Sequence, residues 1–155
     1  MKLYEIYHTI QDSLDALNLA QALGRRIPAN EYIIAKNPKA SYMYALRILH
    51  GRFILGEKSI LDSPEYAYIY ARDIIKGRWK EAEPVIAKSY KNAYFYARDM
   101  INGRFPEAEP HILYDSEYSW FYARDVVKGR WEEAEPVIEQ EPYHWKQYQN
   151  FLRLK

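Results

Sequence analysis

Hydrophobic and polar positions recur along this chain with a period of 26 residues. Within one copy, residues 63–88, apolar residues follow the spacing i, i+3, i+4, i+7, i+8 at Ala67, Tyr70, Ala71, Ile74 and Ile75. That spacing predicts an amphipathic helix with a single buried face. Ser63 and Pro64 supply the N-cap residue and the first-turn proline that commonly open a helix. Gly77 is expected to take the left-handed position at its end.

A second, shorter helix is predicted to follow in the same copy. Trp79 comes two residues after Gly77, and we expect its ring to fold back on the helix that has just ended. Glu81 and Glu83 lie in the predicted first turn, where negative charge complements the helix dipole. Pro84 cannot donate a backbone hydrogen bond, so we expect either a 3₁₀ first turn or a helix that restarts at the proline. The position of Trp79 is also aromatic in the other copies: Phe53, Phe105 and Trp131.

The copies are too similar to be a chance recurrence. Segments 63–88 and 115–140 are identical at 16 of 26 positions, and residues 37–62 form a diverged copy. Each copy contains a glycine followed by an arginine: Gly51 and Arg52, Gly77 and Arg78, Gly103 and Arg104, Gly129 and Arg130. A fixed period of this length is typical of stacked helical arrays.

One helical pair buries too few large side chains to offset the entropy of ordering 26 residues, so the copies must stack. We therefore predict an all-α fold, an α-solenoid of two-helix repeats with atypical ends. A leucine-rich horseshoe is rejected, because no leucine-rich strand is present. A weaker echo at Gly24, Arg25 and Glu31 is one residue out of phase, which predicts a small insertion near the N-terminus. The predicted segments are N-terminal capping helices with a degenerate repeat (1–36), four repeats (37–62, 63–88, 89–114, 115–140) and a C-terminal capping helix (141–155).

Composition excludes several classes of protein. The 155 residues include 22 Lys and Arg against 21 Asp and Glu, so no bulk charge would hold the surface on nucleic acid or an anionic membrane. The absence of cysteine excludes disulfides, thiolate zinc sites and a cysteine nucleophile, and suits a reducing compartment. No apolar stretch approaches the length of a membrane span, and the first residues lack the pattern of a signal peptide. We predict no membrane association.

An aromatic and arginine ladder is the strongest candidate for binding chemistry. It consists of Tyr42, Tyr68, Tyr94 and Trp120 in one column, with Arg72, Arg98 and Arg124 one helical turn further on. Facing outward, the rings and guanidinium groups would hold single-stranded nucleic acid or a nucleotide. Facing inward, the rings would pack between neighbouring helices while the arginines bond to acids. The sequence favours the inward interpretation, because any core residue of an array recurs.

Other charged and ionisable residues have structural interpretations. We predict that the aspartates close the turn around the glycine by ion pairs, with Asp73, Asp99 and Asp125 bonded to Arg78, Arg104 and Arg130. The paired glutamates are explained by the helix dipole. Four histidines share neither spacing nor nearby acids: His8, His50, His111 and His144. We predict no catalytic residues, no metal and no cofactor.

The phrase YARDxIxGRWxEAEPxI occurs at Tyr70–Ile86, Tyr96–Ile112 and Tyr122–Ile138, with small variations. It resembles tandem repeats of uncharacterised proteins from tailed bacteriophages and giant viruses, similar in shape to short tetratricopeptide or Sel1-type arrays. The resemblance covers about residues 37–140. It implies a viral protein in the cytoplasm of its host, and it supplies no site residues.

Three functions are therefore compared. The first, which we predict, is a non-enzymatic interaction module that engages a host or viral protein through a face rich in Tyr, Trp and Arg. The alternative is binding of single-stranded nucleic acid or a small nucleotide by the ladder. An enzyme is the least favoured, because recurrence in every copy is not how a single catalytic site is built. The apolar residues of the tail, 141–155, are expected to cap the last repeat, with docking to a partner as the alternative.

Overall fold

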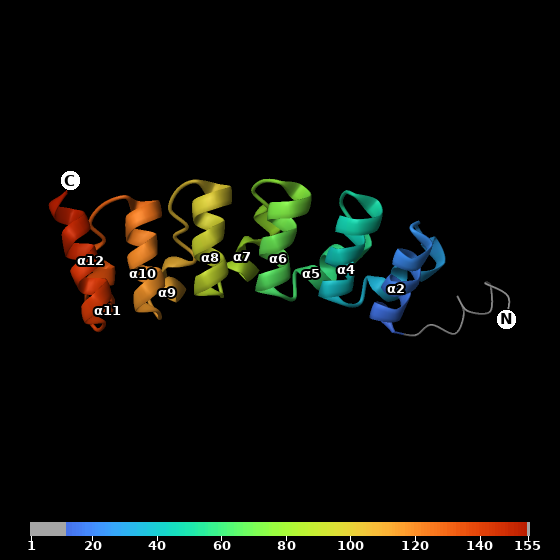
Figure 1. The fold of residues 1–155 in the computed structure, drawn as a ribbon, viewed down its shortest axis with the longest axis horizontal. Helices are drawn as coiled ribbons and strands as arrows, with labels where there is room; N and C mark the ends of the chain where they lie inside the picture. Colours follow the sequence, from blue (N-terminus) through green and yellow to red (C-terminus); the bar gives the residue numbers. More distant parts are fainter. Residues whose placement is uncertain (1–11, 155) are drawn as a thin grey trace. The chain divides into compact units, whose positions relative to one another are not determined.

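The computed structural model describes residues 12–154, and all regular structure in that part of the chain is helical. The prediction of an all-α fold is therefore confirmed. The chain divides into two compact units, Met1–Lys76 and Gly77–Lys155. In each unit, long helices alternate with short ones and neighbouring long helices pack side by side (Figure 1).

In the first unit, α4 packs between the long helices α2 and α6, and the short helix α5 lies against α4. The last turns of two of the long helices are wound as π-helix. The elements are α2 (Ser13–Leu23), the 3₁₀ turn η1 (Pro28–Asn30), α3 (Glu31–Ile34), α4 (Pro38–Tyr44), the π turn η2 (Ala45–Leu49), α5 (Ile54–Ile60), α6 (Pro64–Tyr70) and the π turn η3 (Ala71–Ile75).

In the second unit, α10 packs between the long helices α8 and α12 and against the short helices α9 and α11. The C-terminal helix α12 thus covers the last repeat of the described chain. The elements are η4 (Lys80–Ala82), α7 (Glu83–Ile86), α8 (Tyr90–Tyr96), the π turn η5 (Ala97–Ile101), α9 (Glu109–Ile112), α10 (Ser116–Tyr122), the π turn η6 (Ala123–Val127), η7 (Glu132–Ala134), α11 (Glu135–Ile138) and α12 (Pro142–Arg153).

Each long helix except α12 begins at a side-chain N-cap. Ser63 has extended backbone angles, and its Oγ accepts the N–H of Tyr66 at 3.4 Å. The predicted N-cap and first-turn proline at Ser63 and Pro64 are therefore confirmed. The same role is taken by Asp12, Asn37, Ser89 and Asp115.

The long helices of the repeats end one residue earlier than predicted. The left-handed residue is not Gly77 but Lys76, with φ of 58°. The reason lies in the π turn, which takes one more residue than an α-helical turn and lets the N–H of Gly103 reach the carbonyl of Ala97 at 3.2 Å. The other left-handed residues before a glycine are His50, Asn102 and Lys128.

The N-terminal repeat corrects the predicted insertion. Gly24 takes the left-handed position at φ 60°, and it lies 26 residues before His50, which holds that position in the next repeat. Helix α2 ends in an ordinary turn, with the N–H of Arg25 bonded to the carbonyl of Ala20 at 3.2 Å. The loop is therefore in phase, and α2 lacks the extra residue of the π turn. A missing residue, not an inserted one, produced the shifted pattern.

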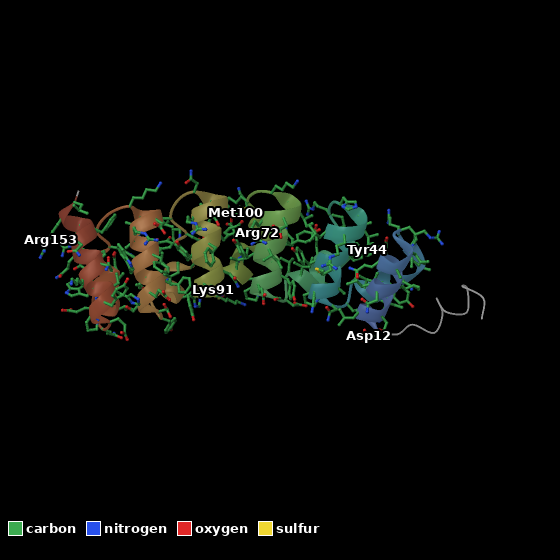
Figure 2. The ribbon with its side chains drawn as sticks, in the orientation of Figure 1. Asp12, Tyr44, Arg72, Lys91, Met100 and Arg153 are labelled. Atoms are coloured by element: carbon green, nitrogen blue, oxygen red, sulfur yellow. The ribbon has the colours of Figure 1, made fainter. Side chains whose placement is uncertain are left out.

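The repeats are joined by buried tyrosines, which we call the inter-repeat tyrosines. Tyr122 is fully buried; its Oη accepts the N–H of Phe105 at 2.6 Å and donates to Glu109 Oε1 at 3.0 Å. Burial is the main cause of the raised pKa of this phenol. The equivalent residues make equivalent bonds: Tyr44 (labelled in Figure 2), Tyr70, Tyr96 and Tyr148.

The aromatic residue after each glycine folds back as predicted. Trp131 is buried, and its ring centroid lies 4.9 Å from that of Tyr122 on the helix that has just ended. Phe53 packs in the same way on Tyr44, with a centroid distance of 5.0 Å. The inward face of the long helix is filled by these rings and by small residues that allow close approach.

The short helices differ between repeats at the proline position. In the second unit, a 3₁₀ turn ends at Ala134 and an α-helix restarts beside Pro136, as the proline predicts. In the repeat 37–62, Lys58 replaces the proline and can donate its N–H, so α5 is one continuous helix. This repeat consequently has a backbone of its own at the short helix.

Candidate functional site

The rings of the predicted ladder are buried. Tyr42 and Tyr68 in the first unit, and Tyr94 and Trp120 in the second, all lie in the interior. Trp120 packs edge-on against Phe151 of α12 at 5.5 Å between centroids. The inward interpretation thus describes these rings, and they present no stacking platform to a ligand.

The ladder arginines lie at the edge of this interior and remain partly exposed. The guanidinium carbon of Arg98 lies 5.2 Å from the ring centroid of Tyr94, one turn earlier, and 5.0 Å from that of Phe95. Arg72 over Tyr68 and Arg124 over Trp120 repeat the arrangement at 5.5 and 5.3 Å. These side chains cover the aromatic rings and hold their charge at the surface.

The ion pairs differ from the prediction. Asp99 pairs with Arg98, its immediate neighbour, while Arg104 forms two bonds of 2.7 Å to Glu109, which opens the next short helix. The same exchange holds in every other case: Asp73 with Arg72, Asp125 with Arg124, Arg78 with Glu83, and Arg130 with Glu135. The glutamate is the partner because it lies on the same side of the loop as the arginine and beside the inter-repeat tyrosine.

The aspartates instead tie one repeat to the next. Tyr94 Oη donates to Asp125 Oδ2 at 2.6 Å, 31 residues further along the chain, and Arg98 donates to the same phenol at 3.1 Å. In the first unit, Tyr42 Oη donates to Asp73 Oδ2 at 2.7 Å. The bonds from Arg72 lower the pKa of the Asp73 carboxyl. The ladder is therefore a network of balanced charges, in which each arginine already has an acid.

Catalytic or metal-binding chemistry finds little support in the described part of the chain. Among residues 12–154, no three His, Asp or Glu side chains gather closely enough to hold a metal ion. His144 Nδ1 lies 3.0 Å from Ser116 Oγ, which is a single contact between the capping helix and the last repeat. His8 lies outside the described residues.

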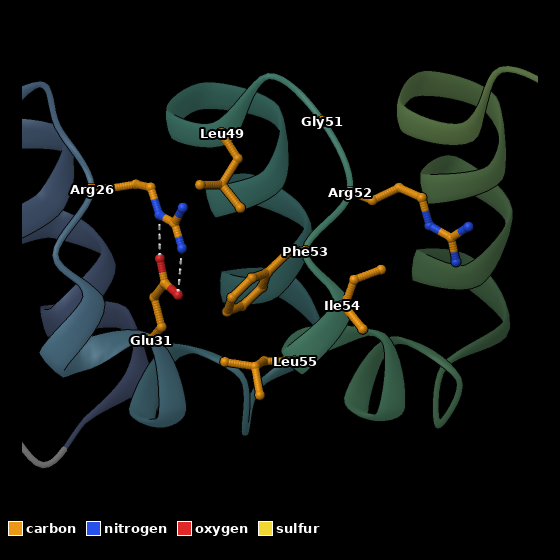
Figure 3. A pocket seen from close by; sticks show the side chains of 8 residues that line it. All are labelled: Arg26, Glu31, Leu49, Gly51, Arg52, Phe53, Ile54 and Leu55. Atoms are coloured by element: carbon orange, nitrogen blue, oxygen red, sulfur yellow. Dashed lines mark hydrogen bonds and ion pairs between the residues drawn. The ribbon is translucent and has the colours of Figure 1, made fainter.

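A different surface stands out on the repeat 37–62 and its N-terminal neighbour. Tyr32, Ile54 and Leu55 expose 60%, 67% and 59% of their area, which is high for large apolar side chains. Together with the half-buried Leu49 they form what we call the α5 patch. Figure 3 shows Ile54 and Leu55 at the start of α5, next to the buried ring of Phe53.

The α5 patch is hollowed on both sides of Leu55. One hollow, of about 360 Å³, is lined by Arg26, Glu31, Leu49 and Phe53 (Figure 3). The other, of about 410 Å³, is lined by Tyr32, Ala35, Lys36, Lys58, Ser59 and Asp62. Because Leu55 borders both hollows, they form one continuous concave surface within the first unit.

A comparison between copies could have found this patch in the sequence. The two residues at the start of the short helix are Ile54 and Leu55 in one repeat, whereas the second unit has charged residues or proline there: Lys80 and Glu81, Pro106 and Glu107, Glu132 and Glu133. The sequence analysis concentrated on what recurs, and this signal consists of what does not recur.

No helix within the described residues has the length and apolar character needed to cross a membrane. Comparison with known proteins gives no further guide, since no family model, no curated protein and no solved structure matches this chain.

Proposed function

We propose that this chain is a non-enzymatic protein-binding module, a viral protein that engages a host or viral protein. The observation that carries the proposal is the α5 patch. Its three exposed apolar side chains are not needed to cover a neighbouring repeat, since the other repeats stack with polar residues or proline at the positions of Ile54 and Leu55. Apolar groups gathered on a surface commonly mark sites of protein association.

The array itself supports this proposal by supplying a rigid base. Every described repeat is fixed to the next by an inter-repeat tyrosine within its unit, so side chains at the surface are held in defined positions. A preorganised surface loses less entropy on binding. Such a base suits recognition of a partner, and it does not require the repeats to perform chemistry.

Binding of single-stranded nucleic acid or a nucleotide by the ladder is the competing function. It requires exposed rings and arginines that can exchange their acids for phosphate. The rings are buried, and each ladder arginine is paired with the aspartate that follows it. Phosphate binding would have to break these pairs, so we place this function second.

The proposal is tested by affinity capture. The purified chain is immobilised and exposed to bacterial lysates, with nuclease added to one half of each sample, and the retained proteins are identified by mass spectrometry. We expect a protein in stoichiometric amount, retained with and without nuclease, that binds the free chain in calorimetry. Recovery of no such protein from several lysates would contradict the proposal.

The competing function is tested in parallel. Calorimetry with single-stranded oligonucleotides and with cyclic nucleotides at low salt should show no binding. If binding is seen and is lost in Arg98→Ala, the ladder is the functional site and the protein-binding proposal is wrong.

A further inference from the structure

We infer that the α5 patch binds a short segment of a partner protein that carries two apolar anchors and acidic side chains beside them. This inference rests on the proposed function, because it names the surface and the chemistry of the partner. Four features carry it: the break in the repeat pattern, the paired hollows, the charges at their rim and the fixed backbone of α5.

The break in the pattern places apolar side chains where stacking does not need them. The position of Leu55 is a glutamate in each repeat of the second unit, Glu81, Glu107 and Glu133, and all three are exposed. Leucine for glutamate at an exposed position lowers solubility and adds nothing to the interior. Such a change is expected where a surface is covered by something outside the repeat.

The two hollows suit two apolar anchors. Their volumes of about 360 and 410 Å³ are each sufficient for one large apolar or aromatic side chain. Leu55 stands between them, with Leu49 and Phe53 on one side and Tyr32 and Ala35 on the other. A segment lying across Leu55 could therefore place one anchor in each hollow, with its backbone over the leucine.

The charges exposed at the rim are mainly positive. Lys36 and Lys58 are exposed beside one hollow, with Asp62 as the only exposed acid among the residues that line it. Beside the other hollow, Arg26 and Arg52 are exposed, and their acid partners lie deeper in the protein: the side chains of Glu31 and Glu57 are only 7% and 14% exposed. A partner with acidic residues is complementary to this rim.

The backbone beneath the patch is fixed by close packing. A Cβ added at Gly56 would lie 2.6 Å from Ser41 Cβ, so α5 sits directly on α4. Ser59 Oγ lies 3.1 Å from Ser41 Oγ, and it also donates to the carbonyl of Gly56 at 2.9 Å. Ile54 and Leu55 are thus held on a rigid helix before a partner arrives.

The experiment uses peptide display with the whole chain as bait. A library of random 12-residue peptides is selected against the wild-type chain, and enriched peptides are synthesised with a fluorophore for polarisation measurements. We expect the enriched peptides to share two apolar residues and at least one Asp or Glu. Raising the salt from 50 to 500 mM should weaken their binding several-fold.

The decisive variant is Ile54→Lys with Leu55→Glu, which gives repeat 37–62 the Lys-Glu pair of residues 80 and 81. These exposed substitutions should leave the melting temperature unchanged and weaken peptide binding at least 10-fold, which corresponds to about 1.4 kcal/mol. Two matched controls should behave differently. Arg98→Ala, in the ladder, should bind as wild type, and Glu132→Ile with Glu133→Leu should create no second site, since the basic rim is absent there.

Three outcomes would overturn the inference. The first is enrichment of no peptide, or of peptides without apolar and acidic residues. The second is binding that survives in the double variant. The third is a concentration-dependent dimer in light scattering that the double variant abolishes, because the patch would then join two copies of this chain. If a captured protein partner binds the double variant as well as wild type, the inference fails while the proposed function stands.

Discussion

Repeat 37–62 and repeat 115–140 perform the same stacking with different surfaces. They share seven residues, among them four fully buried pairs: Ser41 and Ser119, Tyr44 and Tyr122, Ala45 and Ala123, Ile60 and Ile138. The remaining shared residues form the Gly-Arg loop and the glutamate that binds the arginine. Stacking therefore determines the buried residues and the loop, and leaves the outer face of each repeat free to change.

The differences are confined to two places. Repeat 115–140 has Arg124 and Asp125 in the ladder, where repeat 37–62 has Leu46 and Arg47. At the short helix, Glu132 and Glu133 correspond to Ile54 and Leu55, and a proline-broken helix corresponds to the continuous α5. A binding surface in an array is thus better sought in departures from the repeat than in its recurring residues.

The largest effect is expected at the residue that the two repeats share. Tyr122→Ala removes a fully buried ring and leaves the N–H of Phe105 without its acceptor, so we expect a loss of about 3–5 kcal/mol in the free energy of unfolding. Tyr44→Ala should cost a similar amount in the first unit. Urea denaturation followed by circular dichroism measures both. A loss below about 1 kcal/mol in either would show that the repeats do not depend on the tyrosine.

Gly56 should separate the two repeats. Gly56→Ala brings a methyl group to 2.5 Å from Phe53 Cδ1 and 2.6 Å from Ser41, and we expect a loss of about 1–3 kcal/mol. The equivalent residue of the other repeat is already alanine, so Ala134→Gly should cost only about 0.5–1 kcal/mol through backbone entropy. Urea titrations of both variants give the comparison. Equal losses would mean that α5 does not pack more tightly than its counterpart.

Acid should affect the buried glutamate of the first unit more than the exposed one of the second. Bonds from Arg26 lower the pKa of Glu31, so the carboxylate stabilises the fold above its ordinary pKa of 4.5 and that stability is lost as the pH falls below it. Arg130 lowers the pKa of Glu135 in the same way. We expect Glu31→Gln to cost about 1 kcal/mol at pH 7 and to flatten the dependence of melting temperature on pH between 3 and 5.

Glu135→Gln is the matched variant, because its side chain is 21% exposed against 7% for Glu31. Its effect on the melting temperature should be smaller. A wild-type melting temperature that stays constant from pH 7 to pH 3 would contradict the assignment of stability to these carboxylates.

The smallest effect is expected in the ladder. Arg124→Ala removes a cation over Trp120 and a partly exposed ion pair with Asp125, for an expected loss of about 0.5–1 kcal/mol. Leu46→Arg introduces the corresponding arginine in repeat 37–62, but its neighbour there is Arg47, so we expect no gain. Thermal melts detect both changes. Stabilisation by Leu46→Arg would show that the ring alone, without an acid, makes the ladder favourable.

The sequence by itself determined the period, the helical pairs, the N-cap residues and the restart of the short helices at proline. These features depend on backbone sterics and on hydrogen bonds between residues a few positions apart, and the chain states them directly. The fold-back of the aromatic residue after each glycine belongs to the same class, because Trp131 meets Tyr122 only nine residues away.

Only the tertiary structure decided which charges meet, where the left-handed residue falls and which apolar side chains are left exposed. Asp99 was expected to bind Arg104, but the glutamate beside the inter-repeat tyrosine takes that arginine. Whether Leu55 is covered depends on how closely Gly56 brings α5 to α4. Such choices are made by side chains that converge from different repeats, and spacing along one chain does not contain their distances.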